Sequence, residues 1–351
     1  MKKEIFVGNV GIGGNHPISL QSMTSTDTRD TGATLDQIRS LYTVGCDIIR
    51  VAVPDQEALA SFKRIVHESP LPVIADIHFD ASLALGSLRA GAHGIRVNPG
   101  NIGSRSRLVE ILQEARDRGA PIRIGVNFGS IEKKYRKPGV SKTEAMTQSV
   151  MDWVKFFEDQ DFFHIKISVK SSHVRETVAA YRQIDKACDY PLHLGITEAG
   201  TFLSGTIKSA IGIGSLLLDG IGDTIRVSLT ADPVEEIRVG KQILNALGLR
   251  QDNIDIVSCP TCSRTSVDLI PIVEKIEREL AAIKPKGKLT VAVMGCEVNG
   301  PGEAMDADIG LAFSKQFGFI FKKGTMLEKL PPDQAIQRLL DLVRQTQPNT
   351  P

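Results

Sequence analysis

The stretch Gly94-Ile95-Arg96-Val97-Asn98-Pro99 is a short β-rich run, and Ile122-Arg123-Ile124-Gly125-Val126-Asn127 repeats its pattern after a helical stretch near 105–112. Six similar runs lie between residues 18 and 229, and helical patterns separate them. They are 18–23, 47–53, 71–78, 163–170, 191–198 and 224–229. Eight successive strand–helix units, with no Gly-x-Gly-x-x-Gly turn after the first strand, favour a closed (β/α)8 TIM barrel over an open doubly wound sheet.

The two flanks of this region complete the predicted domain organisation. A strand over 1–10, followed by a turn at 11–15, is expected to form a hairpin on the barrel floor, and the eighth helix is expected near 233–247. After a linker at 248–253 the pattern changes to α+β. Strands are predicted near 254–257, 288–294, 308–313 and 317–321, and helices near 266–282 and 333–346. We therefore expect a barrel domain at 1–248 and a smaller α+β domain at 253–351.

The composition narrows the class of protein. The chain has 351 residues, of which 42% are hydrophobic and 24% charged, as in soluble globular proteins. A net charge of +1 and an aromatic content of 5% speak against a nucleic-acid partner. No apolar run approaches the roughly 20 residues that span a bilayer. The start Met1-Lys2-Lys3-Glu4 does not resemble a signal peptide, so a cytoplasmic location is expected.

The predicted strand ends are unusually basic. Because a strand alternates its faces, Arg123 shares a face with Asn127, and Arg226 shares one with Ser228. Several cations at one barrel mouth predict a polyanionic ligand such as a phosphate or diphosphate. The alternative is that some of them face the helices and pair on the outside. The cations are Arg50, Arg96, Arg123, Lys166, Lys170 and Arg226, and Asp76 and Glu198 are the carboxylates at equivalent positions.

Two further polar residues at strand ends have more than one interpretation. Glu198, set among Thr197, Ala199 and Gly200, is a candidate general base or proton relay, and equally a structural partner of Arg226. His78 could bind substrate hydroxyls, but a single histidine is more often a hydrogen-bonded structural residue.

The second domain carries a cysteine pattern typical of a metal site. Cys259-Pro260-Thr261-Cys262 is followed 34 residues later by Cys296, in a turn-rich segment that ends with Glu303. Three thiolates are one short of the four that commonly hold a [4Fe-4S] cluster, and Glu303 is a candidate for the fourth ligand. A structural zinc ion and a disulfide within the Cys-x-x-Cys pair remain alternatives. The other cysteines, Cys46 and Cys188, are interpreted as packed thiols.

Motifs along nearly the whole chain are similar to those of the bacterial 4-hydroxy-3-methylbut-2-enyl diphosphate synthase family. Glu297 stands where an apolar residue is expected, a departure outside the ligand set. The resemblance is to the short two-domain form of the family, which is expected here in place of the plant-type form with its large extra domain. The motifs are Gln21-Ser22-Met23-Thr24, Ile95-Arg96-Val97-Asn98-Pro99-Gly100-Asn101-Ile102-Gly103, Ile124-Gly125-Val126-Asn127, Gly195-Ile196-Thr197-Glu198-Ala199-Gly200, Lys208-Ser209-Ala210-Ile211-Gly212-Ile213-Gly214, Gly220-Ile221-Gly222-Asp223-Thr224-Ile225-Arg226-Val227-Ser228-Leu229, Ser258-Cys259-Pro260-Thr261-Cys262-Ser263-Arg264-Thr265, and Met294-Gly295-Cys296 with Val298-Asn299-Gly300-Pro301-Gly302-Glu303-Ala304.

The resemblance implies specific site residues. A [4Fe-4S] cluster would be held by Cys259, Cys262, Cys296 and Glu303. The diphosphate of 2-C-methyl-D-erythritol 2,4-cyclodiphosphate would be bound by Arg50, Arg96, Arg123, Asn127, Lys170, Arg226 and Ser228. Asp76, His78 and Glu198 would face the ring and its hydroxyls.

The resemblance also implies the reaction and the partners. The reaction would be a two-electron reductive ring opening with loss of water, in which Glu303 gives way to the substrate and Glu198 handles a proton. Ferredoxin or flavodoxin would supply the electrons. A head-to-tail homodimer would place the cluster of one chain over the barrel of the other. The rival hypothesis is a phosphate-binding barrel lyase or synthase with a structural zinc site.

Overall fold

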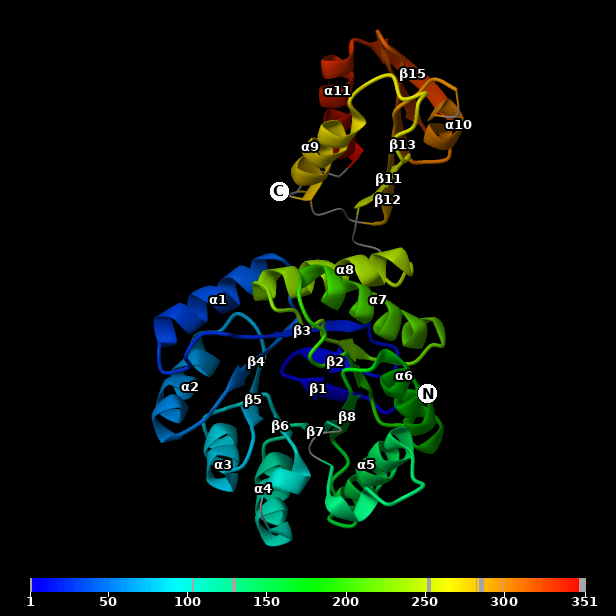
Figure 1. The fold of residues 1–351 in the computed structure, drawn as a ribbon. Helices are drawn as coiled ribbons and strands as arrows, with labels where there is room; N and C mark the ends of the chain where they lie inside the picture. Colours follow the sequence, from blue (N-terminus) through cyan, green and yellow to red (C-terminus); the bar gives the residue numbers. More distant parts are fainter. Residues whose placement is uncertain are drawn as a thin grey trace. The chain divides into compact units, whose positions relative to one another are not determined.

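The chain divides into two units, Met1–Leu249 and Arg250–Pro351 (Figure 1). The computed structural model describes residues 2–102, 104–127, 131–250, 254–281, 283, 287–298 and 300–346. Part of the predicted linker, 251–253, therefore lies outside the described residues. Each unit has its own hydrophobic clusters and is described by itself.

The first unit is built on a parallel sheet in the order β8-β7-β6-β5-β4-β3-β10-β9. An isolated parallel bridge between Ile167 of β8 and Leu192, the residue before β9, closes the sheet on itself. The prediction of a (β/α)8 barrel is confirmed. The strands are β3 (Ser19–Met23), β4 (Ile48–Ala52), β5 (Val73–Ile77), β6 (Gly94–Val97), β7 (Ile122–Asn127), β8 (Ile165–Lys170), β9 (His193–Leu194) and β10 (Thr224–Ile225).

In the described part of this unit, eight α-helices form a ring around the strands (Figure 1). Most of them start at an Asp or Ser whose side chain accepts from a free backbone N–H of the first turn. Asp55 accepts from Ala58 N, and Asp30 accepts from Ala33 N. The helices are α1 (Thr31–Thr43), α2 (Gln56–Glu68), α3 (Ala81–Arg89), α4 (Arg105–Asp117), α5 (Lys142–Glu158), α6 (Val174–Ala187), α7 (Phe202–Leu218) and α8 (Pro233–Ala246), and short 3-10 turns occur at Pro99–Asn101 and Lys133–Tyr135.

The barrel strands alternate between apolar and polar side chains. On β7, Ile122, Ile124 and Val126 belong to the hydrophobic cluster that lies between strands and helices. Arg123 and Gly125 lie on the other face, toward the barrel interior. A TIM barrel usually fills its interior with branched apolar side chains. Here the main apolar core lies outside the strands, and the level of the interior that holds Arg123 is left to polar and charged groups.

A hairpin closes the barrel floor, but its turn differs from the prediction. Strands β1 (Ile5–Val7) and β2 (Val10–Ile12) are antiparallel and turn at Gly8, whose φ is +59°. The expected single strand through Val10 with a turn at 11–15 is wrong, because Gly8 accepts a left-handed backbone that favours glycine. The hairpin packs against residues near the starts of β4 and β5, in a cluster of Ile5, Val7, Ile12, Ile48 and Ile74.

The last two barrel strands are much shorter than predicted. β9 has only His193 and Leu194, and the chain leaves the sheet in a turn where Glu198 has a φ of 52°. β10 ends at Ile225, and Leu229 N donates to the Glu236 carboxylate at 3.1 Å instead of to a neighbouring strand. Both segments therefore become loops at the carboxyl edge of the barrel.

In the second unit, the described residues form a five-stranded mixed sheet in the order β11-β12-β13-β14-β15. One face packs on α9 and α11, and the other carries α10. The sequence pattern did not predict α10 or β15, since Gly300, Pro301 and Gly302 suggested a turn. The elements are β11 (Ile254–Ser258), α9 (Leu269–Ala281), β12 (Leu289–Met294), α10 (Gly300–Met305), β13 (Ile309–Phe313), β14 (Gly318–Lys322), β15 (Thr325–Leu330) and α11 (Pro332–Thr346). None of the helices in the described residues has the length and apolarity needed to cross a bilayer.

Candidate active site

A charged layer runs across four neighbouring strands of the barrel. The strand register pairs Asp76 with Arg96, Arg96 with Arg123, and Arg123 with Lys166. All four residues are buried. Residues that are paired in a parallel sheet point to the same face, so these side chains share one level of the barrel interior.

Asp76 is the anionic centre of this layer. Its Oδ2 lies 3.7 Å from Arg50 Nε and 3.3 Å from His78 Nε2, and its Oδ1 lies 3.4 Å from Arg96 Nη1. Burial by itself would raise the pKa of this carboxyl, but Arg50, His78 and Arg96 hold the pKa well below its usual range. Asp76 is therefore ionised, and it fixes two arginines and a histidine.

A second carboxylate, Glu236 of α8, pairs with Arg226, the residue directly after β10. Its Oε2 lies 3.5 Å from Arg226 Nε and accepts from Ser22 Oγ at 3.1 Å. Arg226 and Arg50 meet at Met23, because Arg50 Nη2 lies 2.9 Å and Arg226 Nη1 3.8 Å from its Sδ. Burial lowers the pKa of Arg50 to about 10. The strand-end pattern did not predict Glu236, since this residue lies on a helix.

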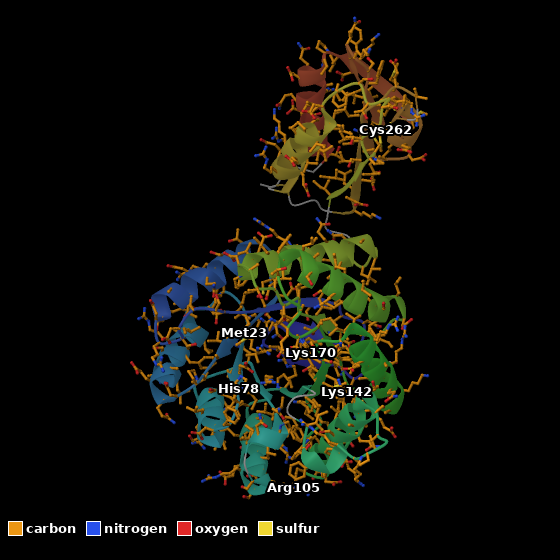
Figure 2. The ribbon with its side chains drawn as sticks, in the orientation of Figure 1. Met23, His78, Arg105, Lys142, Lys170 and Cys262 are labelled. Carbon is orange, nitrogen blue, oxygen red and sulfur yellow. The ribbon has the colours of Figure 1, made fainter. Side chains whose placement is uncertain are left out.

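Two interior glycines make room for cations. A Cβ added at Gly125 would lie 2.8 Å from Arg96 Nε. A Cβ added at Gly195 would lie 2.5 Å from the Arg226 carbonyl oxygen and 2.6 Å from Lys170 Nζ. These distances are too short for real side-chain atoms, so only glycine lets the cations occupy their positions. Figure 2 shows Lys170 and Met23 within the ring of barrel helices.

Several buried polar groups in the barrel interior have no hydrogen-bond partner among the described residues. They include Lys166 Nζ, both ring nitrogens of His193, and Nε and Nη1 of Arg123. Lys166 is 1% exposed and His193 0%. Burial lowers the pKa of the Arg123, Lys166, Lys170 and His193 side chains well below their usual ranges, and the neighbouring cations add to this. The interior therefore carries excess positive charge, which an anion would relieve.

The remaining predicted barrel residues lie at the edge of this interior. Glu198 is exposed in a left-handed turn, and among the described residues it forms no ion pair with Arg226. His78 is exposed, and Ser228 is half-buried in the loop after β10. Asn127 ends β7 opposite Lys170 in the strand register, and its side chain lies outside the described part of the chain.

In the second unit the cysteine segments meet at one edge of the sheet. β11 and β12 are parallel neighbours, so Cys259 and Cys296 follow adjacent strand ends. Gly295 N donates to Cys259 Sγ at 3.3 Å, and Ser266 N donates to Gly295 O at 2.7 Å. The loop that contains Cys262 is thereby fixed against the turn that contains Cys296. No disulfide joins any two of the cysteines, all of which lie in the described part of the chain.

The donor set at this edge fits an iron-sulfur cluster in its chemistry and in the placement of its segments. The Arg264 backbone N–H and guanidinium lower the pKa of the exposed Cys262 thiol, which favours the thiolate that binds metal. Glu303 is exposed on α10, whose first residue, Gly300, lies close to Met294 at the end of β12. The side chains do not form a coordination sphere here. Within the described ranges, no three Cys, His, Asp or Glu side chains are placed to hold one metal ion.

Comparison with known proteins gives the family. Residues 2–241 match the GcpE TIM-barrel domain, and residues 255–345 match the GcpE protein C-terminal domain. The chain belongs to the GcpE family. The barrel and the separate smaller sheet are thus the two parts of a GcpE protein.

Curated relatives cover nearly the whole chain of this GcpE protein. The chain is 56% identical over 330 residues to the 4-hydroxy-3-methylbut-2-en-1-yl diphosphate synthase (flavodoxin) of Geobacter sulfurreducens, covering 94% of this chain and 93% of the relative. It is 52% identical over 329 residues to the protein of the same name from Lawsonia intracellularis, and the alignment covers 93% of this chain and 91% of that relative. The family resemblance drawn from the motifs is therefore confirmed.

A solved structure supports the barrel fold alone. The dihydropteroate synthase of Coxiella burnetii, in complex with pteroic acid, aligns with a TM-score of 0.51 and 10% identity. The alignment covers 71% of this chain and 100% of that chain. At this identity the similarity carries no information on activity.

Proposed function

We propose that this GcpE-family chain catalyses the reductive ring opening and dehydration of 2-C-methyl-D-erythritol 2,4-cyclodiphosphate to 4-hydroxy-3-methylbut-2-enyl diphosphate. The names of its relatives state the product and the synthase activity. One observation in the structure supports it most strongly. The barrel interior gathers buried cations in excess of the carboxylates Asp76 and Glu236 that contact them, as a diphosphate site requires.

In this proposal the diphosphate is held by the cations at the mouth. Arginine presents a planar fork that matches phosphate oxygens, and Lys170 adds a point charge at the end of β8. Asp76 and Glu236 orient their arginine partners before the substrate arrives, so little ordering is needed on binding. The proposed binding residues are Arg50, Arg96, Arg123, Asn127, Lys170, Arg226 and Ser228.

The ring and its hydroxyls would face the polar groups at the edge. His78 is oriented by Asp76 at 3.3 Å and can donate to a hydroxyl oxygen. Glu198, exposed on its left-handed turn, forms no ion pair with the described residues and is the group proposed to transfer a proton. A structural role for Glu198 as the partner of Arg226 has no support, because Glu236 occupies that position.

Cys259, Cys262, Cys296 and Glu303 are the residues proposed to hold a [4Fe-4S] cluster. When bound, such a cluster supplies the electrons of the reduction one at a time. A carboxylate binds iron less firmly than a thiolate, so Glu303 is the ligand that can give way to substrate. The rival hypothesis of a barrel lyase with structural zinc is not favoured, since the matched relatives are synthases of one name.

The proposed partners are a flavodoxin and a second copy of the chain, in the cytoplasm. The word flavodoxin in the relatives' names supports this electron donor over ferredoxin. Self-association is supported by α7, where Leu203, Ile207 and Ile211 are 70%, 50% and 55% exposed and share one face at i, i+4 spacing. An exposed apolar stripe of this kind typically marks an interface.

The test is iron and sulfide analysis of anaerobically purified protein, with EPR after dithionite reduction. Wild type is compared with Glu303→Ala and with a matched control, Glu297→Ala, which removes an exposed carboxylate beside Cys296 that is not a proposed ligand. We expect about four iron atoms per chain, an EPR signal that changes when the cyclodiphosphate is added, and a signal altered by Glu303→Ala alone. Stoichiometric zinc without sulfide would refute the proposal.

A further inference from the structure

Lys166 is a buried cation that the proposed substrate contacts do not use. It lies four residues before Lys170 on β8, on the same face of the strand, and its Nζ has no hydrogen-bond partner among the described residues. Its side chain is almost completely buried. A charged ammonium in such a place is costly unless an anion accompanies it.

The groups around Lys166 come from four barrel strands or their flanks. The positive charges of Arg123 on β7 and Arg50 on β4 lower the pKa of Lys166. His193 lies on β9, and neither of its ring nitrogens has a hydrogen-bond partner among the described residues. The carboxylate of Asp223, just before β10, raises the pKa of Lys166, but this carboxylate already accepts a hydrogen bond from Leu192 N at 2.7 Å. Lys166 is therefore surrounded by more positive charge than negative charge.

Lys170, nearer the carboxyl end of β8, is also buried among cations. Its charged neighbours are Arg123, Arg226, Arg50 and Arg96. The backbone of Gly195 lies against its Nζ and brings no negative charge. Arginine does not release its proton in proteins, whereas a buried lysine can do so. In the ligand-free barrel the lysines are therefore the groups that lose a proton to relieve the repulsion.

We propose that Lys166 is a further residue of the anion site, which takes up a proton from solvent together with Lys170 when the cyclodiphosphate enters the barrel. The step converts a neutral amine and one solvent proton into an ammonium beside the incoming anion. This inference rests on the proposed function. It favours an anion of two charges over an anion of one, because each added negative charge makes lysine protonation more favourable.

The direction of a pH effect follows from the state of the two lysines. They have lowered pKa values in the free barrel, and the bound anion raises them again. Between these two values binding consumes protons, so affinity falls as the pH rises. The ligand itself contributes little, because each phosphate of a cyclic diphosphate carries only one strongly acidic proton, which is already lost near neutral pH.

The experiment is titration calorimetry of the holoenzyme with the cyclodiphosphate, without reductant, in several buffers of different ionisation enthalpy at about pH 8. The slope of the observed enthalpy against the buffer ionisation enthalpy gives the number of protons taken up. We expect uptake of about one proton or more by the wild type. We expect Lys166→Met to lose a substantial part of that uptake and to bind about tenfold more weakly.

Three further variants make the outcome decisive. Lys166→Gln repeats the test with a polar side chain, so that a packing defect in one variant does not decide the result. Lys63→Met, at an exposed position on α2, is the matched control and should keep the wild-type slope. His193→Gln removes the buried imidazole beside Lys166, the other base that could take up the proton, and should keep the wild-type uptake. Binding with a slope of zero, or uptake that both Lys166 variants retain, overturns this inference and leaves the proposed function intact. Absence of any binding refutes both.

Discussion

At the scale of single residues, the barrel depends on carboxylates that are buried with arginines. Asp76 contacts Arg50, Arg96 and His78, and Glu236 contacts Arg226. Removing a buried carboxylate leaves its cations uncompensated, which costs more than the pair contributes. Asp76 and Glu236 therefore stabilise a cationic interior that would otherwise oppose folding.

Asp76→Asn tests this dependence. We expect the free energy of unfolding to fall by about 3 to 5 kcal/mol at neutral pH, because two buried guanidinium groups lose their anion. Since the folded pKa of Asp76 is lowered, its contribution is fully present above the unfolded pKa of about 4 and diminishes as the pH falls below it. The measurement is urea unfolding from about pH 3 to about pH 8.

The matched control for this prediction is Asp36→Asn. Asp36 pairs with Arg39 on the exposed face of α1, where an ion pair contributes about 0.5 kcal/mol. Equal losses in the two variants would contradict the assigned role of Asp76. A loss in Asp76→Asn that grows as the pH falls below about 4 would contradict it as well.

The sequence predicts which charged residues belong to the site better than it predicts which side chains they contact. The basic strand ends were visible because Arg and Lys are rare in buried strands, and Asp76 stood among them. Glu236 was missed because its position on α8 is that of an ordinary helix residue, and nothing in the sequence pattern shows that it contacts Arg226. His193 was missed because one histidine in an apolar run is usually structural.

At the scale of elements, the strand ends depend on glycine as much as on charge. Gly195 follows β9, and the Arg226 carbonyl and Lys170 Nζ fill the space that a side chain would take. The ammonium group of Lys170 therefore lies directly against the backbone of Gly195, just after β9.

Gly195→Ala is expected to displace Lys170 and weaken cyclodiphosphate binding by about tenfold, with a loss of about 1 to 3 kcal/mol in stability from overpacking. The matched control is Gly214→Ala in α7, where an added Cβ meets nothing within 4 Å. That substitution should be neutral or stabilising by up to about 1 kcal/mol. Calorimetric affinity and thermal melting measure both effects. Unchanged affinity in Gly195→Ala would show that Lys170 does not need this glycine.

The elements themselves were predictable where the pattern repeats. Alternating apolar and charged residues on β7 and β8 predicted buried strands with one polar face, and the helices between them followed from apolar spacing. The misses occur where local chemistry overrides a pattern. The hairpin turns at Gly8 and not at 11–15, and β9 ends before the left-handed turn at Glu198. After Cys296, α10 begins at Gly300, which packs against Met294 and Ala312, where a larger residue does not fit.

At the scale of the whole molecule, the exposed face of α7 predicts self-association. We expect Leu203→Glu with Ile207→Glu to convert a dimer into monomers without lowering the melting temperature of the monomer, because both side chains are exposed in the single chain. Sedimentation velocity measures the change. Tyr42→Glu on α1, a matched exposed apolar position, should leave the dimer intact. A dimer that survives the double substitution would place the interface elsewhere.

The two units of the chain should also unfold separately. The hydrophobic cluster of the barrel shares no residue with the clusters of the second unit, and all four proposed cluster ligands lie in the second unit. A bound group stabilises only the unit whose folded form binds it. In scanning calorimetry of the full chain we expect two transitions, and removal of the cluster should lower one and leave the other unchanged. Cys262→Ser should reproduce this loss, whereas Cys188→Ser, a thiol in the barrel unit, should not. A single transition that moves as a whole on cluster removal would mean that the units unfold as one cooperative body, and stability would then be shared between them.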